Sequence, residues 1–264
     1  MTLPDILWVK HGERGHVDQV AVGSGNLRIS GIKGVIFDLE GTLVGCQWDL
    51  AGEVELRAAF SGLGFAKEAL GTRTYATMWN WAVTLPGAPA DEATLRARIG
   101  PIYDRWDADA LSRWQPRPGA AEVLARLAAS GHLVGMATTV GRAAQRAAAE
   151  RFGFAPYLDP IVTRDDVRLL KPEPECVRRC LDAWGISPDE ALMVGDSRGD
   201  TGAARRAGVR VAILAGGETP RRAFADDPPD VFLESLTDLE ALLSGEEATR
   251  ARAVNRESAP SAPE

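Results

Sequence analysis

Short apolar runs alternate with amphipathic segments over the second half of the chain. The apolar runs predict buried strands at residues 132–137, 191–194 and 209–214, with shorter apolar steps at 161–162 and 231–233. The amphipathic segments predict helices at about 120–130, 142–152 and 174–184, another that ends at Ala207, and a closing helix at 236–243. An earlier apolar run at 35–37 adds a strand. This alternation predicts an α/β fold, in which a parallel sheet carries helices on both faces.

Residues 46–115 carry helical patterns and no strand-like run. The helical spacing i, i+3, i+4 and i+7 defines one face, which consists of Tyr75, Met78, Trp79 and Ala82. A second such face consists of Leu95, Ile99, Ile102, Tyr103 and Trp106. Gly100 and Pro101 are expected to break or kink this second helix.

Tryptophans are concentrated in the same segment, at Trp48, Trp79, Trp81, Trp106 and Trp114. Most of them are expected to form the core of a small helical module. Trp81 lies off the first helical face, so a pocket or surface position is expected for it.

The two ends of the chain differ from the rest. Residues 1–32 form an N-terminal extension, in which the apolar stretches 20–22 and 27–29 flank a Gly-rich turn and predict a small hairpin or a loose arm. Residues 245–264 are polar and rich in proline, which is typical of a disordered tail.

Composition narrows the class of protein. A chain of 264 residues with 45% hydrophobic and 25% charged residues is long enough to bury a sizeable core. The net charge of −7 argues against a general nucleic-acid binder, because the phosphate backbone repels it. No apolar stretch is long enough to span a bilayer, and no secretory signal is evident, so no membrane association and a cytoplasmic location are expected.

Three cysteines are present, Cys46, Cys176 and Cys180. Cys176 and Cys180 have helical i,i+4 spacing, and no Cys or His cluster accompanies them. They are interpreted as small half-buried helix residues rather than as a metal or redox pair.

The strand at residues 35–37 ends at two carboxylates, Asp38 and Glu40, followed by Gly41 and Thr42. Side chains two residues apart lie on the same side of an extended chain, so both carboxylates can face one ligand. Open α/β sheets place their chemistry at such strand ends. Taken alone, an ordinary polar turn explains this segment equally well.

Three later segments change this balance. The strand at 132–137 ends at Thr138 and Thr139, Lys171 lies in a Leu-Leu-Lys-Pro-Glu-Pro stretch, and the strand at 191–194 leads to Asp196 and Asp200. The order is acid pair, hydroxyl, lysine and acid pair. Over roughly residues 34–244 this set resembles the four motifs of the haloacid dehalogenase (HAD) superfamily of phosphotransferases and phosphatases.

The resemblance implies a Rossmann-like, doubly wound parallel sheet as the core, formed by residues 33–45 and 116–244, with an inserted α-helical cap at 46–115. The position of the insert is similar to that of the helical cap in the subgroup that contains phosphoglycolate phosphatase and β-phosphoglucomutase. In that subgroup the cap closes over the site and selects the substrate.

The resemblance also implies roles for the motif residues. Asp38 would be the nucleophile that forms an aspartyl-phosphate, and Mg²⁺ would be held by Asp38, the Glu40 carbonyl and Asp196, with support from Asp200. Thr138 would donate its hydroxyl to the phosphate, and Lys171 would neutralise phosphate charge. Helix capping remains open for Asp200, and a surface loop position for Lys171.

Four further residues are candidates for binding the substrate. The backbone at Gly41 and Thr42 can form a concave nest for phosphate. Thr139 and Arg142 follow the second strand and can contact the phosphate or the rest of the substrate. For Arg142, an ordinary position on a helix surface is equally plausible.

Glu40 departs from the family pattern. HAD phosphatases usually carry Asp at this position, as the acid that protonates the leaving alcohol and then activates water. Glutamate keeps the chemistry but moves the carboxyl group by roughly 1.5 Å. The enolase-phosphatases of the same superfamily carry Glu here, so catalysis is compatible with this residue.

The predicted function is that of a Mg²⁺-dependent phosphomonoesterase acting on a small phosphorylated metabolite, as a monomer or homodimer. A phosphomutase would share the aspartyl-phosphate and remains an alternative, as does a non-catalytic binding or regulatory protein with the same fold. A haloacid dehalogenase is disfavoured, since several acids around Asp38 would repel a carboxylate substrate.

Overall fold

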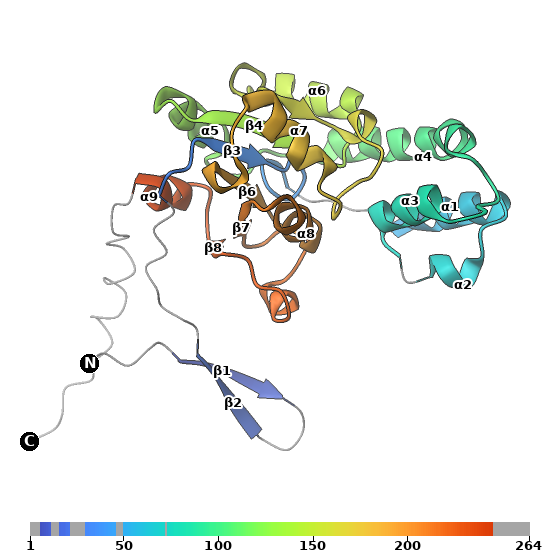
Figure 1. Ribbon diagram of the computed structural model, residues 1–264, viewed down its shortest axis with the longest axis horizontal. Coiled ribbons are helices and arrows are strands. Elements are labelled where there is room, and N and C mark those ends of the chain that lie inside the picture. The colour runs from blue at the N-terminus through green and yellow to red at the C-terminus, as the bar shows by residue number, and fades with distance from the viewer. Residues whose placement is uncertain (1–5, 12–15, 22–29, 46–49, 72, 245–264) are drawn as a thin grey trace, which may run out of the picture.

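The computed structural model describes residues 6–11, 16–21, 30–45, 50–71 and 73–244. Within this part, a sheet flanked by helices forms the core, and a group of helices extends from one side of it (Figure 1). The predicted tail at 245–264 lies outside the described residues.

The core sheet has six parallel strands in the order β5-β4-β3-β6-β7-β8. Their bounds are β3 Gly34–Phe37, β4 Leu133–Ala137, β5 Ile161–Val162, β6 Ala191–Gly195, β7 Arg210–Leu214 and β8 Val231–Leu233. The chain runs outward from β3 to β5 on one side and then crosses to β6 on the other. The predicted doubly wound α/β sheet is therefore confirmed.

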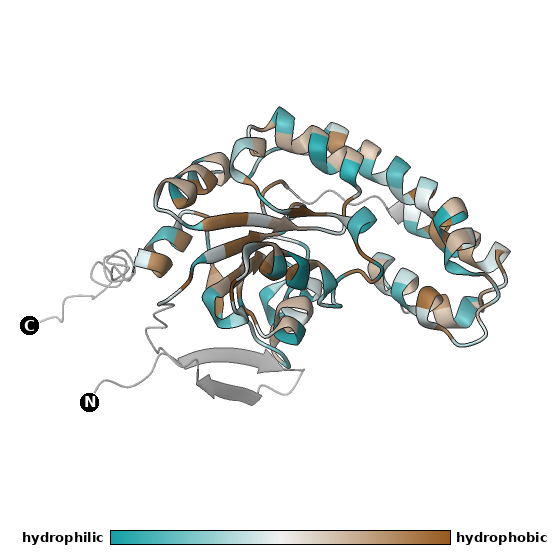
Figure 2. Cartoon of the chain, turned by 45° about the horizontal axis from the view of Figure 1, so that its top comes forward, coloured by the Kyte–Doolittle hydropathy of each residue, from teal (hydrophilic) through white to brown (hydrophobic). Residues whose placement is uncertain are grey.

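Each central strand is apolar on both faces because helices cover both. In β3, Val35 and Phe37 belong to one buried cluster and Ile36 to the other. The first cluster includes α5 Ala120–Ala129, α6 Arg142–Arg151 and α9 Asp238–Ser244, and the second includes α7 Glu175–Trp184 and α8 Arg198–Ala207. Figure 2 shows the hydrophobic strands enclosed between these helices. Such double coverage is why the strands read as continuous apolar runs.

Four helices lie between β3 and β4, in the segment that the sequence predicted to be the cap, and this segment is called the cap below. They are α1 Leu50–Gly62, α2 Lys67–Leu70, α3 Tyr75–Thr84 and α4 Glu92–Arg113. The helices α1 and α4 pack so closely that a Cβ on Gly52 would overlap the Trp106 ring, and only glycine fits there. Buried cap residues such as Phe60 and Tyr103 share one hydrophobic cluster with the α7–α8 side of the sheet. The cap therefore packs directly on the core.

The helix α4 is not broken at Gly100 and Pro101 but continues to Arg113, so the expected break is wrong. The packing of Ile99 and Tyr103 in the hydrophobic cluster offsets the cost of the proline ring.

Among the tryptophans, Trp79 belongs to the same cluster and Trp81 and Trp106 pack against it, whereas Trp114 is fully buried in the cluster of α5 and α6. Trp48 lies outside the described residues.

The N-terminal extension contains a hairpin ahead of the segment for which the sequence predicted one. The strands β1 Ile6–His11 and β2 His16–Ala21 pair antiparallel, with His11 opposite His16. Residues 22–29, which include the predicted Gly-rich turn, lie outside the described residues.

Candidate active site

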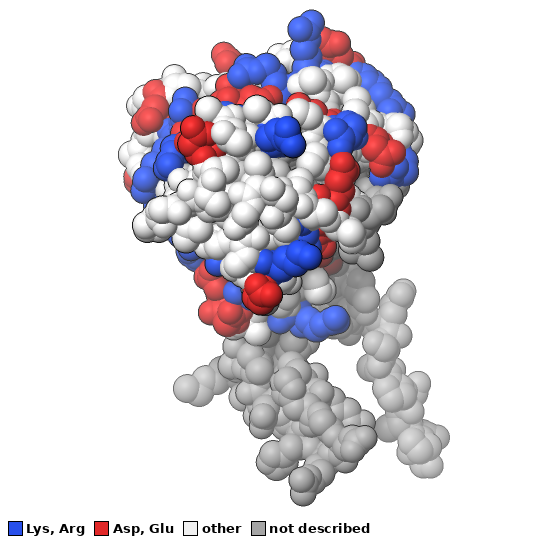
Figure 3. All heavy atoms as spheres, turned by 90° about the vertical axis from the view of Figure 1, so that its right-hand side faces the viewer, with Lys and Arg blue, Asp and Glu red and all other residues white. Residues whose placement is uncertain are grey.

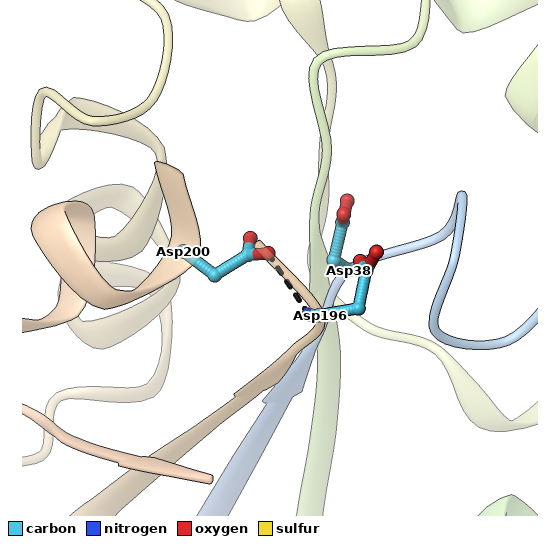
Figure 4. Close-up of side chains that lie close together, drawn as sticks. All are labelled: Asp38, Asp196 and Asp200. Carbon is cyan, nitrogen blue, oxygen red and sulfur yellow. Dashed lines mark hydrogen bonds between the residues drawn. The ribbon is translucent and has the colours of Figure 1, made fainter. Parts of the chain in front are cut away.

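Asp38 and Asp196 lie side by side because β3 and β6 are neighbouring parallel strands that end together. Phe37 is paired with Val194, and the Asp38 backbone N–H donates to the Val194 carbonyl at 2.9 Å. The order in which strands are added to the sheet reverses between β3 and β6, which is where open α/β sheets form their binding crevice. Asp38, Asp196 and Asp200 are all buried, and each offers a carboxylate oxygen within 4.8 Å of the others (Figure 4).

Glycines allow this close approach of the carboxylates. Gly41 has φ +84°, and a Cβ there would lie 2.1 Å from Oδ2 of Asp196. A Cβ on Gly195 would lie 2.3 Å from the Asp200 carboxyl carbon, and one on Gly217 would lie 2.3 Å from Cβ of Asp196. Side chains at these positions would displace the acids.

Both oxygens of Asp196 are held by neighbouring groups. The Thr42 hydroxyl donates to Oδ1 at 3.1 Å, and the Glu218 backbone N–H donates to Oδ2 at 2.6 Å. Thr42, predicted as a phosphate contact, thus orients Asp196. Sequence reasoning missed Gly217 and Glu218, although the glycine pair Gly216–Gly217 directly after an apolar strand is a signal for a functional turn.

Lys171 lies between two of the acids. Its Nζ is 2.8 Å from Oδ1 of Asp38 and 2.5 Å from Oδ1 of Asp200, and all three side chains are buried. Burial lowers the pKa of Lys171, but the Asp200 and Asp38 charges outweigh it, so the pKa lies above its usual value. A surface loop position for Lys171 is therefore wrong.

Asp200 caps a helix, which the sequence offered as one of its two roles, and it also contacts Lys171, which the sequence did not predict. Its Oδ2 accepts hydrogen bonds from the Ser197 hydroxyl at 2.7 Å and from the Ser197 and Asp196 backbone N–H groups, which forms a capping box at the start of α8. Its Oδ1 holds Lys171. The cap of α8 thus places the carboxylate that fixes the lysine.

The cluster carries more negative than positive charge. Burial raises the pKa of Asp38 to about 6 although Lys171 opposes the shift, and burial together with the Asp200 and Asp38 charges raises the pKa of Asp196 well above its usual value. Apart from its ion contact with Lys171, Oδ1 of Asp38 accepts no hydrogen bond within the described part of the chain. Within the described residues, the members of this cluster are all carboxylates, and such buried oxygen ligands fit a hard divalent cation such as Mg²⁺.

Glu40 is held by a residue that the sequence did not connect with the site. The indole Nε1 of Trp114 donates to Oε1 of Glu40 at 3.0 Å. Burial raises the pKa of Glu40 to about 7, while this hydrogen bond acts in the opposite direction. A carboxyl group with such a pKa can release or accept a proton near neutral pH.

Three predicted site residues follow β4, and their surroundings differ. Thr138 is buried at the strand end, and its Oγ1 accepts the Val140 N–H at 3.2 Å, which leaves its own hydroxyl proton free to be donated elsewhere. The Thr139 carbonyl accepts a hydrogen bond from the Tyr75 hydroxyl of the cap at 3.4 Å. Arg142 is exposed and pairs with Asp166 at 2.5 Å, so the structure does not bring it to the carboxylate cluster.

A buried ion pair joins the cap to the core beside this loop. Arg164 of the core lies 2.7 Å from Oδ2 of Asp107 in α4 and donates to the Tyr75 hydroxyl at 2.6 Å. The same Asp107 oxygen accepts the Gly141 N–H at 2.8 Å. Arg164 and Asp107 are both buried, so the cap is tied to the segment that follows Thr138.

Several arginines of the cap contact other residues of the cap. Arg57 donates to Arg73 and Leu70 carbonyls, Arg105 pairs with Glu55, and Arg113 pairs with Asp109. Arg73 stacks over Trp81, which is half-buried against Phe65. Figure 3 shows this end of the molecule, where basic and acidic side chains lie next to one another around an uncharged area.

Comparison with known proteins agrees with this geometry. Residues 32–208 match the family model described as haloacid dehalogenase-like hydrolase. The chain belongs to the haloacid dehalogenase-like hydrolase family. The predicted family and fold are thereby confirmed.

The relatives of this chain include proteins named phosphoglycolate phosphatase. The protein of Rhodospirillum rubrum is 33% identical over 193 residues, covering 70% of this chain and 80% of that protein. The protein of Yersinia pseudotuberculosis is 32% identical over 222 residues, covering 81% and 94%. Among solved structures, CbbY from Rhodobacter sphaeroides in complex with phosphate has a TM-score of 0.58 and 25% identity, covering 81% of this chain and 99% of that one.

Proposed function

We propose that this protein is a Mg²⁺-dependent phosphomonoesterase that hydrolyses a small phosphorylated metabolite through an aspartyl-phosphate on Asp38. The main observation that supports this function is the position of Lys171 between Asp38 and Asp200, with Asp196 beside them. The names of the relatives support this function, and phosphoglycolate is the first substrate to test.

In the first step, a carboxylate oxygen of Asp38 attacks phosphorus, and the bond from phosphorus to the substrate oxygen breaks. The carboxylate and the phosphate are both anions, so attack requires positive charge near both. Lys171 supplies it from 2.8 Å. Thr138 would donate its hydroxyl to a phosphate oxygen, and Thr139 and the Gly41–Thr42 backbone would contact the bound group.

Glu40 would handle the proton in both steps. Protonated Glu40 gives its proton to the leaving alcohol, and the resulting carboxylate then takes a proton from the water that attacks the aspartyl-phosphate. Hydrolysis of that intermediate releases phosphate and regenerates Asp38. The hydrogen bond from Trp114 orients the longer Glu40 side chain for this exchange.

The residues that would hold Mg²⁺ are Asp38, the backbone carbonyl of Glu40 and Asp196, with Asp200 in support. When bound, the ion would offset negative charge on the phosphate as Asp38 attacks. Thr42 and the Glu218 backbone orient Asp196 for this role.

Residues 46–115 would form the cap that selects the substrate. Arg105 and Arg113 of the cap form ion pairs with other cap residues, and Arg142 of the core pairs with Asp166. We therefore expect these arginines to contribute less to substrate selectivity than the uncharged and aromatic surface of the cap. Among the helices that the structure describes, none combines the length and the apolar character that a bilayer-spanning helix needs. A cytoplasmic location, a monomeric or homodimeric state and the lack of nucleic-acid binding remain predictions.

A turnover assay tests this function. The protein should hydrolyse 4-nitrophenyl phosphate and phosphoglycolate with Mg²⁺ and lose activity with excess chelator. Interconversion of sugar phosphates without phosphate release would favour the phosphomutase. No turnover of a broad panel of phosphorylated metabolites would favour the non-catalytic alternative.

A further inference from the structure

The segment that precedes Lys171 is held by the cap. The indole Nε1 of Trp79 in α3 donates to the Arg168 carbonyl at 2.9 Å. Arg168 in turn donates to the Val83 carbonyl at 2.8 Å and pairs with Glu92 of α4 at 2.9 Å. These contacts form a seam between residues 167–170 of the core and the helices α3 and α4.

Asn80 makes the contact of this seam that lies nearest to the proposed catalytic lysine. Its amide Nδ2 donates to the Leu170 carbonyl at 2.7 Å, and its Oδ1 accepts the Leu170 N–H at 2.7 Å. One side chain thus satisfies both polar groups of a single residue's backbone. Leu170 itself is buried, so those groups have little access to water.

The next residue in the chain is Lys171. The Leu170 carbonyl also accepts the Glu173 N–H at 2.9 Å, which closes a turn around Lys171 and Pro172. Asn80 therefore anchors the start of the turn from which the Lys171 side chain extends to Asp38 and Asp200. A displaced turn would lengthen the contacts of Nζ, because lysine acts as a point charge whose effect depends on distance.

We propose that Asn80 is a positioning residue, through which the cap fixes Lys171 against Asp38 and Asp200. Asn80 does not touch the carboxylates and acts through the Leu170 backbone. Only a correctly seated cap provides the Asn80 amide, so the seating of the cap and the charge that assists Asp38 are coupled. This inference rests on the proposed function.

A matched control separates this role from a general weakening of the seam. Asn80→Ala removes both hydrogen bonds to Leu170, and Asn80→Asp removes the donor while preserving the size of the side chain. Glu92→Gln removes the ion pair of the same seam with Arg168, and a pair with Arg96 inside α4, but leaves the Leu170 backbone untouched. Thermal unfolding of each variant checks that the fold is retained.

The experiment measures kcat and KM for 4-nitrophenyl phosphate and the affinity for inorganic phosphate with Mg²⁺ present. Asn80→Ala should lower kcat about 10-fold, since it removes both partly buried hydrogen bonds that hold the turn. Asn80→Asp should also lower kcat, because its carboxylate faces the Leu170 carbonyl without a donor. Glu92→Gln should change kcat less than about 2-fold. In a Lys171→Gln background, Asn80→Ala should have almost no further effect on phosphate affinity, because the charge that it positions is gone.

Equal effects of Asn80→Ala and Glu92→Gln on kcat would overturn the proposal. So would the same loss of phosphate affinity with and without Lys171, because Asn80 would then act on the cap as a whole. Failure of the proposed function has a different signature, in which the wild type itself shows neither Mg²⁺-dependent turnover nor phosphate binding. That result would overturn both.

Discussion

The indole of Trp114 donates a hydrogen bond to the carboxylate of Glu40 at 3.0 Å. Trp114 follows the last cap helix α4 and is buried in the core, whereas Glu40 follows the carboxyl end of β3. This hydrogen bond fixes the position of the Glu40 carboxylate, whose side chain is one methylene longer than that of the usual Asp. We therefore expect the length of this glutamate side chain to matter for activity.

Shortening Glu40 tests this expectation. Glu40→Asp withdraws the carboxylate by roughly 1.5 Å and breaks the contact with Trp114. Activity toward poor leaving groups should fall about 10-fold or more, as measured by kcat/KM. Trp114→Phe should also reduce activity in the wild type but add little in the Glu40→Asp background, because the hydrogen bond is already lost. A gain of activity in Glu40→Asp would contradict this expectation.

Removing the proton-transfer group should show a dependence on the leaving group. Glu40→Gln keeps the shape of the side chain but cannot release or accept a proton. Hydrolysis of alkyl phosphates should slow by about 10²–10⁴-fold, and formation of the aspartyl-phosphate from 4-nitrophenyl phosphate much less, since nitrophenolate leaves without a proton. The check is a series of substrates with graded leaving groups under single-turnover conditions. A uniform loss across the series would show that Glu40 carries no proton.

The close approach of Gly41 to Asp196 predicts a strong effect of one methyl group. Gly41→Ala combines an unfavourable positive φ with a Cβ placed 2.1 Å from Oδ2 of Asp196. Gly87 also has a positive φ, +66°, but a Cβ there meets nothing within 4 Å, so Gly87→Ala is the matched control. The control should lose about 1 kcal/mol of stability in chemical denaturation. Gly41→Ala should lose more and should also weaken Mg²⁺ binding, measured by calorimetry; similar losses in both variants would argue against the crowded carboxylate site.

The buried pair of Arg164 and Asp107 should stabilise the seating of the cap. Asp107→Ala leaves a buried guanidinium with fewer partners and an unpaired Gly141 N–H, and should cost about 3 kcal/mol in the free energy of unfolding. Asp109→Ala removes an exposed partner of Arg113 in the same helix and should change stability little. Denaturant titration compares the two, and an equal loss for both variants would be the contrary result.

Much of the fold could be predicted from local pattern. The apolar strands end at Asp38, Thr138 and Asp196, and their alternation with helices fixes a parallel sheet, so the meeting of these side chains at one edge follows from topology. The continuation of α4 through Pro101 could not be predicted, because packing of the cap helices outweighs the local cost of proline.

The contacts that refine the site could not be predicted either. Trp114 and Glu40 are 74 residues apart, and Asn80 and Leu170 are 90 apart, so no periodicity relates them. The pairing of Arg142 with Asp166 likewise depends on tertiary structure, and it draws away a side chain that the sequence offered to the substrate.

The central claim is that Asp38 is the nucleophile, and trapping of its phosphorylated form tests it most directly. The Glu40→Gln variant, mixed with 4-nitrophenyl phosphate and Mg²⁺ and quenched in acid, should carry a phosphoryl group, because loss of the base slows its hydrolysis. Reduction with borohydride and peptide mass spectrometry should place the modification on Asp38. Asp38→Asn in the same background should carry no label and show no turnover. A label on another residue, or substantial hydrolysis by Asp38→Asn, would contradict the account.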